Sequence, residues 1–513
     1  MSDRARSCPV RRNAALFVLF GLFGYSFMAC VSTTYAGDAE AFTYPDSRAG
    51  EIARAWIEQF NSGDDEQTRR FEETYRAESA LKKRSVEDRL ARYPQLRGML
   101  GTLSPHSVLD QTPNGIKLLA RSGLMNMWLS LRFDLEPEAP HKLKSLEVRP
   151  AADPDTAAIS YDDWKDLAEL VEQVRSDMGS PALAVAVGDS TGIREVAVAG
   201  VRVVGTDERV LADDPFHVGS ITKSMTATII GTLVDRGVLD FDVTLAEALP
   251  DIEMRSEYRT VTLEQLLAHR GGIAQQLTFD DPAMARLVGL PGTPLQQRAE
   301  YIAEVLQMEP IATPGTEMHY SNAGYAIAGH IAERAAGSGW ETLVVETVFE
   351  PIGMTTAAIG WPATAQHPDR PRGHFIEAGE LRAQGIGEYP LGSFLAPAGD
   401  VHCSAKDLAN YGRAHLNGLD GKDGVVSAKT IRRLHTPVAD SEPRYAGGWV
   451  INETPDGAVL HWHNGSAGTF YGSLSIWPER DLVIAVLANS VSPSGEPIIE
   501  KMNAAISKRL SED

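Results

Sequence analysis

The chain has 513 residues, of which 43% are hydrophobic and 23% are charged, so it is long enough for two or three domains with sizeable cores. Its 69 acidic residues outnumber 48 basic ones, and the net charge of −21 argues against nucleic-acid binding and against charge-driven binding to an anionic membrane surface. Three cysteines are too few for a disulfide scaffold or for a zinc site built on a cysteine cluster.

The first 36 residues are predicted to be an export signal. Arginines precede an apolar run at residues 14–29 that is short for a membrane span. Cleavage after Ala36 would leave a soluble mature chain. Alternatively, the signal ends at residue 29 and Cys30 becomes a lipidated N-terminus; an uncleaved anchor is a third option. We therefore expect an exported protein, periplasmic or extracellular, that is either soluble or held to a membrane by a lipid.

Residues 40–150 are expected to form a small α+β domain in which helices precede strands. Apolar residues between Ile52 and Phe60 share one face of a helix that ends at Gly63, and a second helical stretch covers residues 84–100. The strand candidates are Ser107–Gln111, Ile116–Ala120, Met125–Phe133 and Leu143–Val148. This layout resembles the NTF2-like fold, which implies an accessory or dimerising domain and no chemistry of its own.

Residues 151–158 form a polar, proline-bearing linker, and residues 159–513 are predicted to be the second domain. This domain opens with an apolar helix face around Leu167–Val174, and strands open and close it. The strand candidates are Ala182–Val187, Arg194–Val203, Gly472–Trp477 and Leu482–Ala488, and a helix follows through residues 498–510. We predict an antiparallel sheet assembled from both ends of the domain, flanked by helices, with a helical lobe inserted at about 220–440 and a cleft between the lobes.

Two serine motifs compete for the role of nucleophile. Residues 188–192 satisfy G-x-S-x-G, but a strand pattern follows Ser190 where a nucleophile elbow requires a helix, so we interpret the segment as a hairpin turn. Ser220 and Lys223 form an S-x-x-K at the start of a predicted helix, a spacing that places the lysine one turn beyond the serine. A serine hydroxyl needs a neighbour that takes its proton, and a lysine with a lowered pKa can do so.

Two further segments carry candidate site residues. Tyr320 and Asn322 belong to a Y-S-N segment before a predicted helix. His461 and His463 alternate on a predicted strand that leads into the small residues 465–468, which would let a substrate approach the backbone. Two histidines at this spacing are also candidate metal ligands, but no third ligand lies nearby in the sequence, so we do not expect a metal site here.

Taken in order, S-x-x-K, Y-S-N and H-x-G resemble the serine β-lactamase and penicillin-binding-protein superfamily, most closely its class C-like branch of DD-carboxypeptidases and esterases. Segments at 266–273, 351–354, 397–400 and 447–449 also fit the family pattern. The resemblance covers roughly residues 156–510. It implies the family's two-lobe fold, an α/β (α+β) architecture, and a serine hydrolase that works through an acyl-enzyme and needs no metal or organic cofactor.

The resemblance also implies a role for each motif residue. Ser220 would be acylated, and Lys223 and Tyr320 would share the general-base work. The substrate-binding and oxyanion residues would be Asn322, His463, Gly465 and Ser466, with the backbone N–H groups of Ser220 and Ser466 forming the oxyanion hole.

One departure from the family pattern affects the choice of substrate. His463 stands where β-lactamases of this branch usually have lysine, so carboxylate binding there should be weaker or pH-dependent, which puts efficient β-lactam hydrolysis in doubt. The predicted substrate is a small or peptidoglycan-like ester or amide. A non-catalytic binding protein that keeps the fold, a weak β-lactamase and a metal-dependent hydrolase remain alternatives, and the oligomeric state is open.

Overall fold

The computed structural model of the chain describes residues 42–512 apart from 124–127, 152–153, 155–158, 275–290, 378–379, 389–390, 439–443, 455 and 492–494. The predicted export signal, Cys30 and most of the predicted linker lie outside the described residues. Within the described part, no helix is long and apolar enough to cross a membrane.

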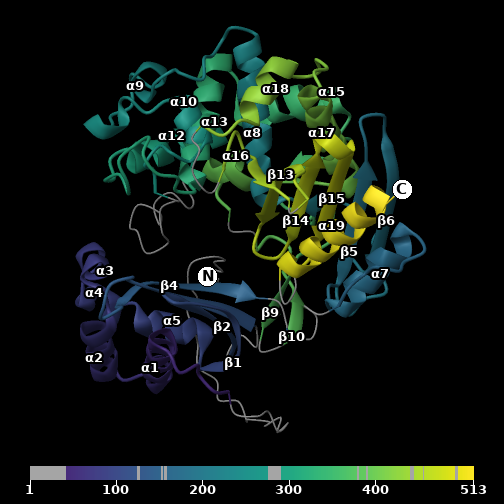
Figure 1. Cartoon of the computed structure of the whole chain (residues 1–513). Coiled ribbons are helices and arrows are strands. Elements are labelled where there is room, and N and C mark those ends of the chain that lie inside the picture. The colour runs from purple at the N-terminus through teal and green to yellow at the C-terminus, as the bar shows by residue number, and fades with distance from the viewer. Residues whose placement is uncertain are drawn as a thin grey trace, which may run out of the picture.

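Residues 42–151 form a unit with its own hydrophobic core, drawn in purple and blue in Figure 1. Its elements are α1 (Arg48–Ser62), α2 (Asp65–Tyr75), α3 (Glu78–Lys83), α4 (Val86–Leu90), α5 (Tyr93–Leu100), β1 (Leu103–Thr112), β2 (Gly115–Ser122), β3 (Trp128–Leu135) and β4 (Leu143–Ala151). The strands pair antiparallel in the order β1-β2-β3-β4, and the apolar face of α1 packs on this sheet. The mixed architecture of helices before strands agrees with the expectation, while the NTF2-like resemblance stays a prediction.

Of the two helices predicted in this unit, one ends where expected and the other is divided in two. The helix expected to end at Gly63 does so, because Gly63 adopts a left-handed conformation (φ 70°) that closes α1. The single helical stretch expected over 84–100 is wrong, since the chain turns at residues 91–92 between α4 and α5. Pro94 explains the break: it lacks an N–H and is tolerated only in the first turn of a new helix, where it lies here.

The larger unit is built on a six-stranded antiparallel sheet with the order β12-β13-β14-β15-β5-β6. These strands and the helices that cover them are α7 (Leu167–Asp177), β5 (Ala182–Gly188), β6 (Ile193–Gly200), α8 (Thr222–Asp235), α17 (Ala405–Leu419), β12 (Val450–Glu453), β13 (Val459–Ser466), β14 (Tyr471–Trp477), β15 (Leu482–Ala488) and α19 (Gly495–Glu512). Pairing of β15 with β5 joins the two ends of the domain, as the sequence predicted.

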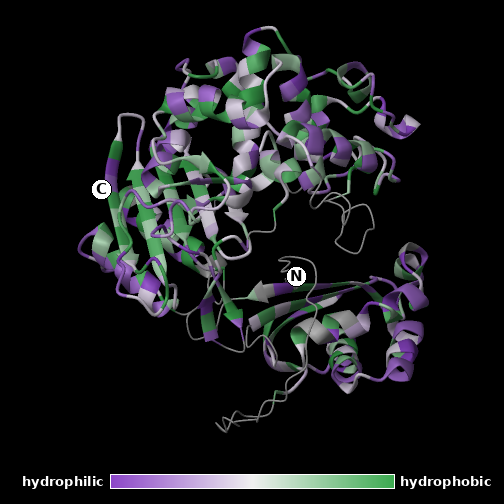
Figure 2. Ribbon diagram, turned by 180° about the vertical axis from the view of Figure 1, so that it is seen from behind, coloured by the Kyte–Doolittle hydropathy of each residue, from purple (hydrophilic) through white to green (hydrophobic). Residues whose placement is uncertain are grey.

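Alternate residues of the central strands enter two different cores. In β5, Ala182, Ala184 and Ala186 belong to the cluster that includes α8 and α17, whereas Leu183, Val185 and Val187 pack against α7 and α19. A strand buried on both faces explains the continuous apolar run in its sequence. Figure 2 shows the strands of this sheet coloured largely as hydrophobic. Among the described residues, neither cluster extends into the N-terminal unit.

The helical lobe lies between β6 and β12 in the sequence and beside the sheet in Figure 1. Its helices are α9 (Leu245–Ala248), α10 (Leu263–Leu267), α12 (Pro294–Val305), α13 (Asn322–Ala336), α14 (Trp340–Val344), α15 (Glu350–Ile352), α16 (Ala396–Gly399) and α18 (Ala428–Leu434). Its short helical turns are η1 (Gly219–Ile221), η2 (Ser256–Tyr258), η3 (Val345–Phe349) and η4 (Ser393–Leu395), and a fifth turn, η5 (Pro478–Arg480), connects β14 to β15 in the sheet. Short strands complete the unit: β7 (Phe216–His217), β8 (Ala358–Ile359), β9 (His374–Glu377), β10 (Glu380–Ala383) and β11 (Val401–Cys403).

Candidate active site

Ser220 and Lys223 lie together at the start of α8. Ser220 is the middle residue of the helical turn η1, which continues directly into α8. Lys223 Nζ lies 3.1 Å from Ser220 Oγ, so the spacing of the S-x-x-K segment does bring the two groups into contact. The Lys223 side chain is fully buried, and this burial lowers its pKa well below the usual value of a lysine.

Two strong acceptors surround the rest of the Lys223 amine. Lys223 Nζ donates to Asn322 Oδ1 and to the Ala398 carbonyl oxygen, each at 2.7 Å. Asn322 is the first residue of α13, where Ser321 caps the helix by accepting from the Gly324 N–H. Ala398 lies on α16. Elements from three parts of the chain therefore converge on one buried amine.

Tyr320 lies just before α13 and faces both partners. Its ring centroid is 4.6 Å from Lys223 Nζ, and its hydroxyl contacts Ser220. Burial raises the pKa of Tyr320 above its usual value, and the contact with Ser220 only partly offsets this rise. The phenol is therefore held in its neutral, proton-carrying form.

The ring of His269 packs against the ring of Tyr320. The two rings lie 4.3 Å apart, and the Ser321 N–H donates to His269 Nδ1 at 3.1 Å. His269 adopts a left-handed backbone conformation (φ 57°) that is uncommon for a residue with a side chain. Burial lowers its pKa well below the usual value, with the charge of Lys223 adding to the effect, so the ring packs against Tyr320 as a neutral group.

The end of β13, at Gly465 and Ser466, packs closely against the turn that carries Ser220. A Cβ atom on Gly465 would lie 1.9 Å from the Val218 carbonyl oxygen and 2.7 Å from the Ser220 nitrogen. A Cβ atom on Gly219, which has φ of 52°, would lie 2.4 Å from the Ser466 nitrogen. Only glycine permits this approach, which places the backbone nitrogens of Ser220 and Ser466 at the same edge of the site.

His463 is buried and both of its ring nitrogens are engaged. Nδ1 contacts the Asn464 carbonyl oxygen and Nε2 lies 2.9 Å from the Tyr445 hydroxyl. A carbonyl can only accept, so Nδ1 carries the proton, and Tyr445 donates to Nε2 of a neutral ring. Burial and the nearby Lys223 lower the pKa of His463 to about 3. Tyr445 is a site residue that no motif in the sequence indicated.

The remaining sequence candidates lie apart from Ser220. Ser190 occupies the turn between β5 and β6, where its N–H and hydroxyl donate to Asp481, so the interpretation as a hairpin turn is correct. His461 shares the face of β13 with His463 but contacts His435. The described residues include no group of three or more His, Cys, Asp or Glu side chains arranged to hold a metal ion.

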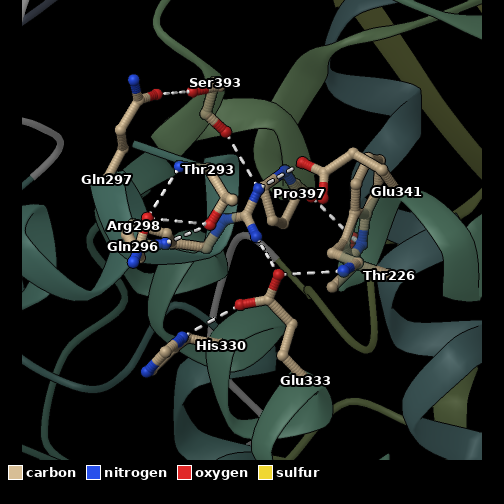
Figure 3. A network of polar contacts seen from close by, with 11 residues as sticks. Thr226, Thr293, Gln296, Gln297, Arg298, His330, Glu333, Glu341, Ser393 and Pro397 are labelled. Atoms are coloured by element: carbon tan, nitrogen blue, oxygen red, sulfur yellow. Dashed lines mark hydrogen bonds and ion pairs between the residues drawn. The ribbon is translucent and has the colours of Figure 1, made fainter. Parts of the chain in front are cut away.

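A buried ionic network fixes the elements that carry Asn322 and Ala398 (Figure 3). Arg298 of α12 pairs with Glu333 of α13 and, at 2.6 Å, with Glu341 of α14, and it donates to the Ser393 carbonyl oxygen just before α16. Arg298 and Glu333 are fully buried. Because a buried charge is costly without its partner, these pairings specify how α13 and α16 sit relative to each other.

Comparisons with known proteins identify the family of the larger unit. A family model described as Beta-lactamase matches residues 167–507. The chain belongs to the Beta-lactamase family. Penicillin-binding protein 4 of Amycolatopsis lactamdurans is 30% identical over 336 residues, which cover 63% of this chain and 84% of that protein. The match to the family model begins at α7, so the N-terminal unit lies outside that match.

Solved structures give the same result for the fold of this Beta-lactamase family member. The penicillin-binding protein homologue from Pyrococcus abyssi is 26% identical with a TM-score of 0.56, covering 66% of this chain and 75% of that one. A D-stereospecific amidohydrolase from Streptomyces is 22% identical with a TM-score of 0.52, covering 66% of this chain and 97% of that one, and shows the shared fold alone. Relatives of these kinds support a serine hydrolase family.

Proposed function

We propose that this protein is an exported serine hydrolase that cleaves a small ester or amide through a covalent acyl-enzyme on Ser220. The observation that carries the proposal is the environment of the Lys223 amine. A neutral amine has two hydrogens and one lone pair. Asn322 Oδ1 and the Ala398 carbonyl oxygen, both at 2.7 Å, accept the two hydrogens. Lys223 Nζ also lies 3.1 Å from Ser220 Oγ, so in the neutral amine the lone pair is what remains to accept the Ser220 proton.

In the first step, Ser220 Oγ bonds to the substrate carbonyl carbon while its proton passes to Lys223 Nζ. The C–O or C–N bond to the leaving group then breaks, and the leaving group takes up a proton. In the second step, water hydrolyses the acyl ester, which releases the carboxylic acid and restores the Ser220 hydroxyl. Between the two candidate bases we favour Lys223, because burial lowers the pKa of Lys223 and raises that of Tyr320. Tyr320 fits the protonation of the leaving group, and the proton held by Lys223 then passes to Tyr320, which restores the neutral amine and the neutral phenol before the second step.

The backbone nitrogens of Ser220 and Ser466 are the proposed donors to the oxyanion that forms in each step. Donors of this kind typically contribute ~3 kcal/mol each to lowering the barrier. The glycines at 219 and 465 support this role, since their close approach keeps the two nitrogens at one edge of the site. Asn322 is proposed to bind the substrate amide in addition to its contact with Lys223.

The environment of His463 favours substrates without a carboxylate next to the scissile bond. A neutral ring with both nitrogens engaged offers no fixed positive charge to such a group. We therefore expect amides of D-amino acids and simple carboxylic esters to be better substrates than peptides with a free terminal carboxylate, and we expect β-lactam hydrolysis to be weak. A penicillin-binding protein among the relatives leaves acylation by a penicillin as a useful probe.

The test is the intact mass of the protein after incubation with a penicillin and with a p-nitrophenyl ester. Wild type should gain the mass of one acyl group, Ser220→Ala should gain none, and Ser190→Ala, which changes the serine of the G-x-S-x-G turn, should behave as wild type. An adduct on Ser220→Ala would exclude Ser220 as the nucleophile. No adduct and no turnover on wild type across a panel of esters and D-amino-acid amides would favour the non-catalytic binding protein.

A further inference from the structure

Three buried histidines form a chain that the proposed chemistry does not use. His461 lies on β13, His435 directly follows α18, and His415 lies on α17. His461 Nδ1 is 3.0 Å from His435 Nδ1, and His435 Nε2 is 2.9 Å from His415 Nδ1. His461 is the most exposed of the three and keeps only 8% of its surface accessible. The Trp449 ring stacks on His435 with the ring centroids 4.6 Å apart, which shields the middle of the chain.

The chain continues from His415 into α8. His415 Nε2 lies 3.2 Å from Thr228 Oγ1, and Thr228 Oγ1 lies 2.9 Å from the Tyr411 hydroxyl. Tyr411 donates to Ser224 Oγ at 3.0 Å, and Ser224 donates to the Ile221 carbonyl oxygen at 2.8 Å. Ile221 and Ser224 are the direct neighbours of Ser220 and Lys223 in the sequence. The chain thus connects the strand that carries His463 and Ser466 to the helix that carries the nucleophile (Figure 1).

Counting hydrogens shows that neutral rings satisfy all three contacts of the histidines, from His461 to His435, from His435 to His415 and from His415 to Thr228. Thr228 donates its own hydrogen to the Ser224 carbonyl oxygen at 2.9 Å, so its oxygen accepts from His415 Nε2–H. His415 Nδ1 then accepts from His435 Nε2–H, and His435 Nδ1 accepts from His461 Nδ1–H. Each contact holds one proton. A second proton on His415 or His435 would place two N–H groups against each other and break the chain.

We propose that this histidine chain is a positioning device for acyl transfer, which sets the separation between β13 and the Ser220 turn. The proposal rests on the proposed function of Ser220. The chain does not deliver protons to the reaction, because its last hydrogen bond ends on the Ile221 carbonyl oxygen and not on a reacting side chain. His415, His435 and His461 are therefore positioning residues.

The separation matters because β13 and the Ser220 turn touch through glycine backbones. The closest approach is between Gly465 of β13 and the Val218 carbonyl oxygen next to the Ser220 turn. No side chain lies between the two backbones there, so a movement of either element changes their separation directly. The segment at Gly448, next to Trp449, also lies close to α8, since a Cβ atom there would lie 2.5 Å from Ser224 Cα. Misplacement of reacting groups by ~1 Å can cost ~100-fold in rate, so a hydrogen-bonded link of defined length is a suitable device here.

The kinetic test compares His435→Phe with His435→Gln. Phenylalanine fills the ring volume but breaks both contacts, whereas glutamine keeps one donor and one acceptor. We expect His435→Phe to lower kcat per acylated site by ~10- to 100-fold with KM within ~2-fold of wild type, and we expect His435→Gln to recover most of the loss. The matched control is His374→Phe. His374 is a buried histidine on β9 that binds the Asn489 carbonyl oxygen and the Val204 N–H, and its loss should lower Tm without changing kcat.

A folded His435→Phe protein with wild-type kcat would overturn the inference, and so would a loss of kcat that His374→Phe reproduces at equal loss of Tm. A wild-type protein that is never acylated would instead overturn the proposed function of Ser220, and the inference with it. Should His435→Phe fail to fold, imidazole nitrogen NMR of wild type at pH 7 decides. The chain requires three neutral rings with one hydrogen in each contact between them, so a charged ring, or tautomers that leave either contact between the histidines without a hydrogen, would refute it.

Discussion

Replacement of Asn322 by aspartate should raise the pKa of the Lys223 amine and so move the pH range in which this amine acts as a base upward. Asn322→Asp is nearly isosteric and places a carboxylate 2.7 Å from Lys223 Nζ. An opposite charge at this distance favours the ammonium form and typically raises the pKa of its partner by ~1–3 units, and each unit lowers the neutral fraction tenfold. Because Asn322 is partly exposed, solvent screening favours the lower half of this range.

The expected result is a shift of the acid limb of the pH profile. In wild type, burial lowers the pKa of Lys223, so acylation should already be fast near neutral pH and fall only as the pH drops through that lowered pKa. In Asn322→Asp, the midpoint of this limb should move up by ~1–2 pH units, so at any pH below the wild-type midpoint the rate should fall by ~10- to 100-fold, and it should recover as the pH rises through the new, higher pKa. The measurement is the burst of p-nitrophenol during acylation by a p-nitrophenyl ester, followed by stopped flow from pH 5 to 10.

Asn322→Ala is the control, because it removes the amide without adding charge. It should lower the rate, through weaker substrate binding and loss of one acceptor for Lys223, without moving the limb toward high pH. If Asn322→Asp and Asn322→Ala lower the rate by a constant factor at every pH and keep the wild-type midpoint, Lys223 is not the group whose neutral form drives acylation. Tyr320 would then become the leading candidate for the base.

Three further predictions follow from the packing around the site. Gly465→Ala should lower the acylation rate by ~100-fold by stopped flow, because its Cβ would lie 1.9 Å from the Val218 carbonyl oxygen; a wild-type rate would contradict this contact. Folding lowers the pKa of His461 from 6.5 to about 4, so its contribution to stability is complete above pH 6.5 and is lost as the pH falls toward 4. The free energy of unfolding in urea should therefore fall by about 3 kcal/mol over this range, and it should fall by less in His461→Gln. Glu333→Gln should lower the free energy of unfolding by about 3 kcal/mol in the same assay, because Arg298 would lose its buried partner. An unchanged urea midpoint would refute the stabilising role of this ion pair.

The sheet could be predicted from the sequence because its central strands have an unmistakable pattern. The runs Ala182–Val187 and Leu482–Ala488 are apolar throughout, which is typical of strands buried on both faces, and both lie in the strands that join the two ends of the domain. The contact of Ser220 with Lys223 was also predictable, since their spacing places them one helical turn apart. Helix α2 was not predicted, because its polar sequence buries few apolar side chains.

The contacts that complete the site could not be predicted, because each joins residues with no shared pattern. The Ala398 carbonyl oxygen is 175 residues from Lys223, and a backbone acceptor has no signature in a sequence. Tyr445 reaches His463 across 18 residues from a loop without periodicity. The histidine chain is similar, since His415, His435 and His461 come from three elements and each residue alone is indistinguishable from an ordinary core histidine.

His463 shows how the surroundings of a residue decide between chemical options that its identity leaves open. The sequence predicts weaker or pH-dependent carboxylate binding at this position. In the folded protein, the ring could become a cation only near its lowered pKa of about 3, and its protonation would also break the hydrogen bond that Nε2 accepts from Tyr445. Since His461 has a pKa of about 4, the fold itself loses stability before His463 can gain charge. We therefore expect His463 to stay neutral at the pH values where the fold is most stable, and we expect selectivity to come from the shape and neutral hydrogen-bonding groups of the site.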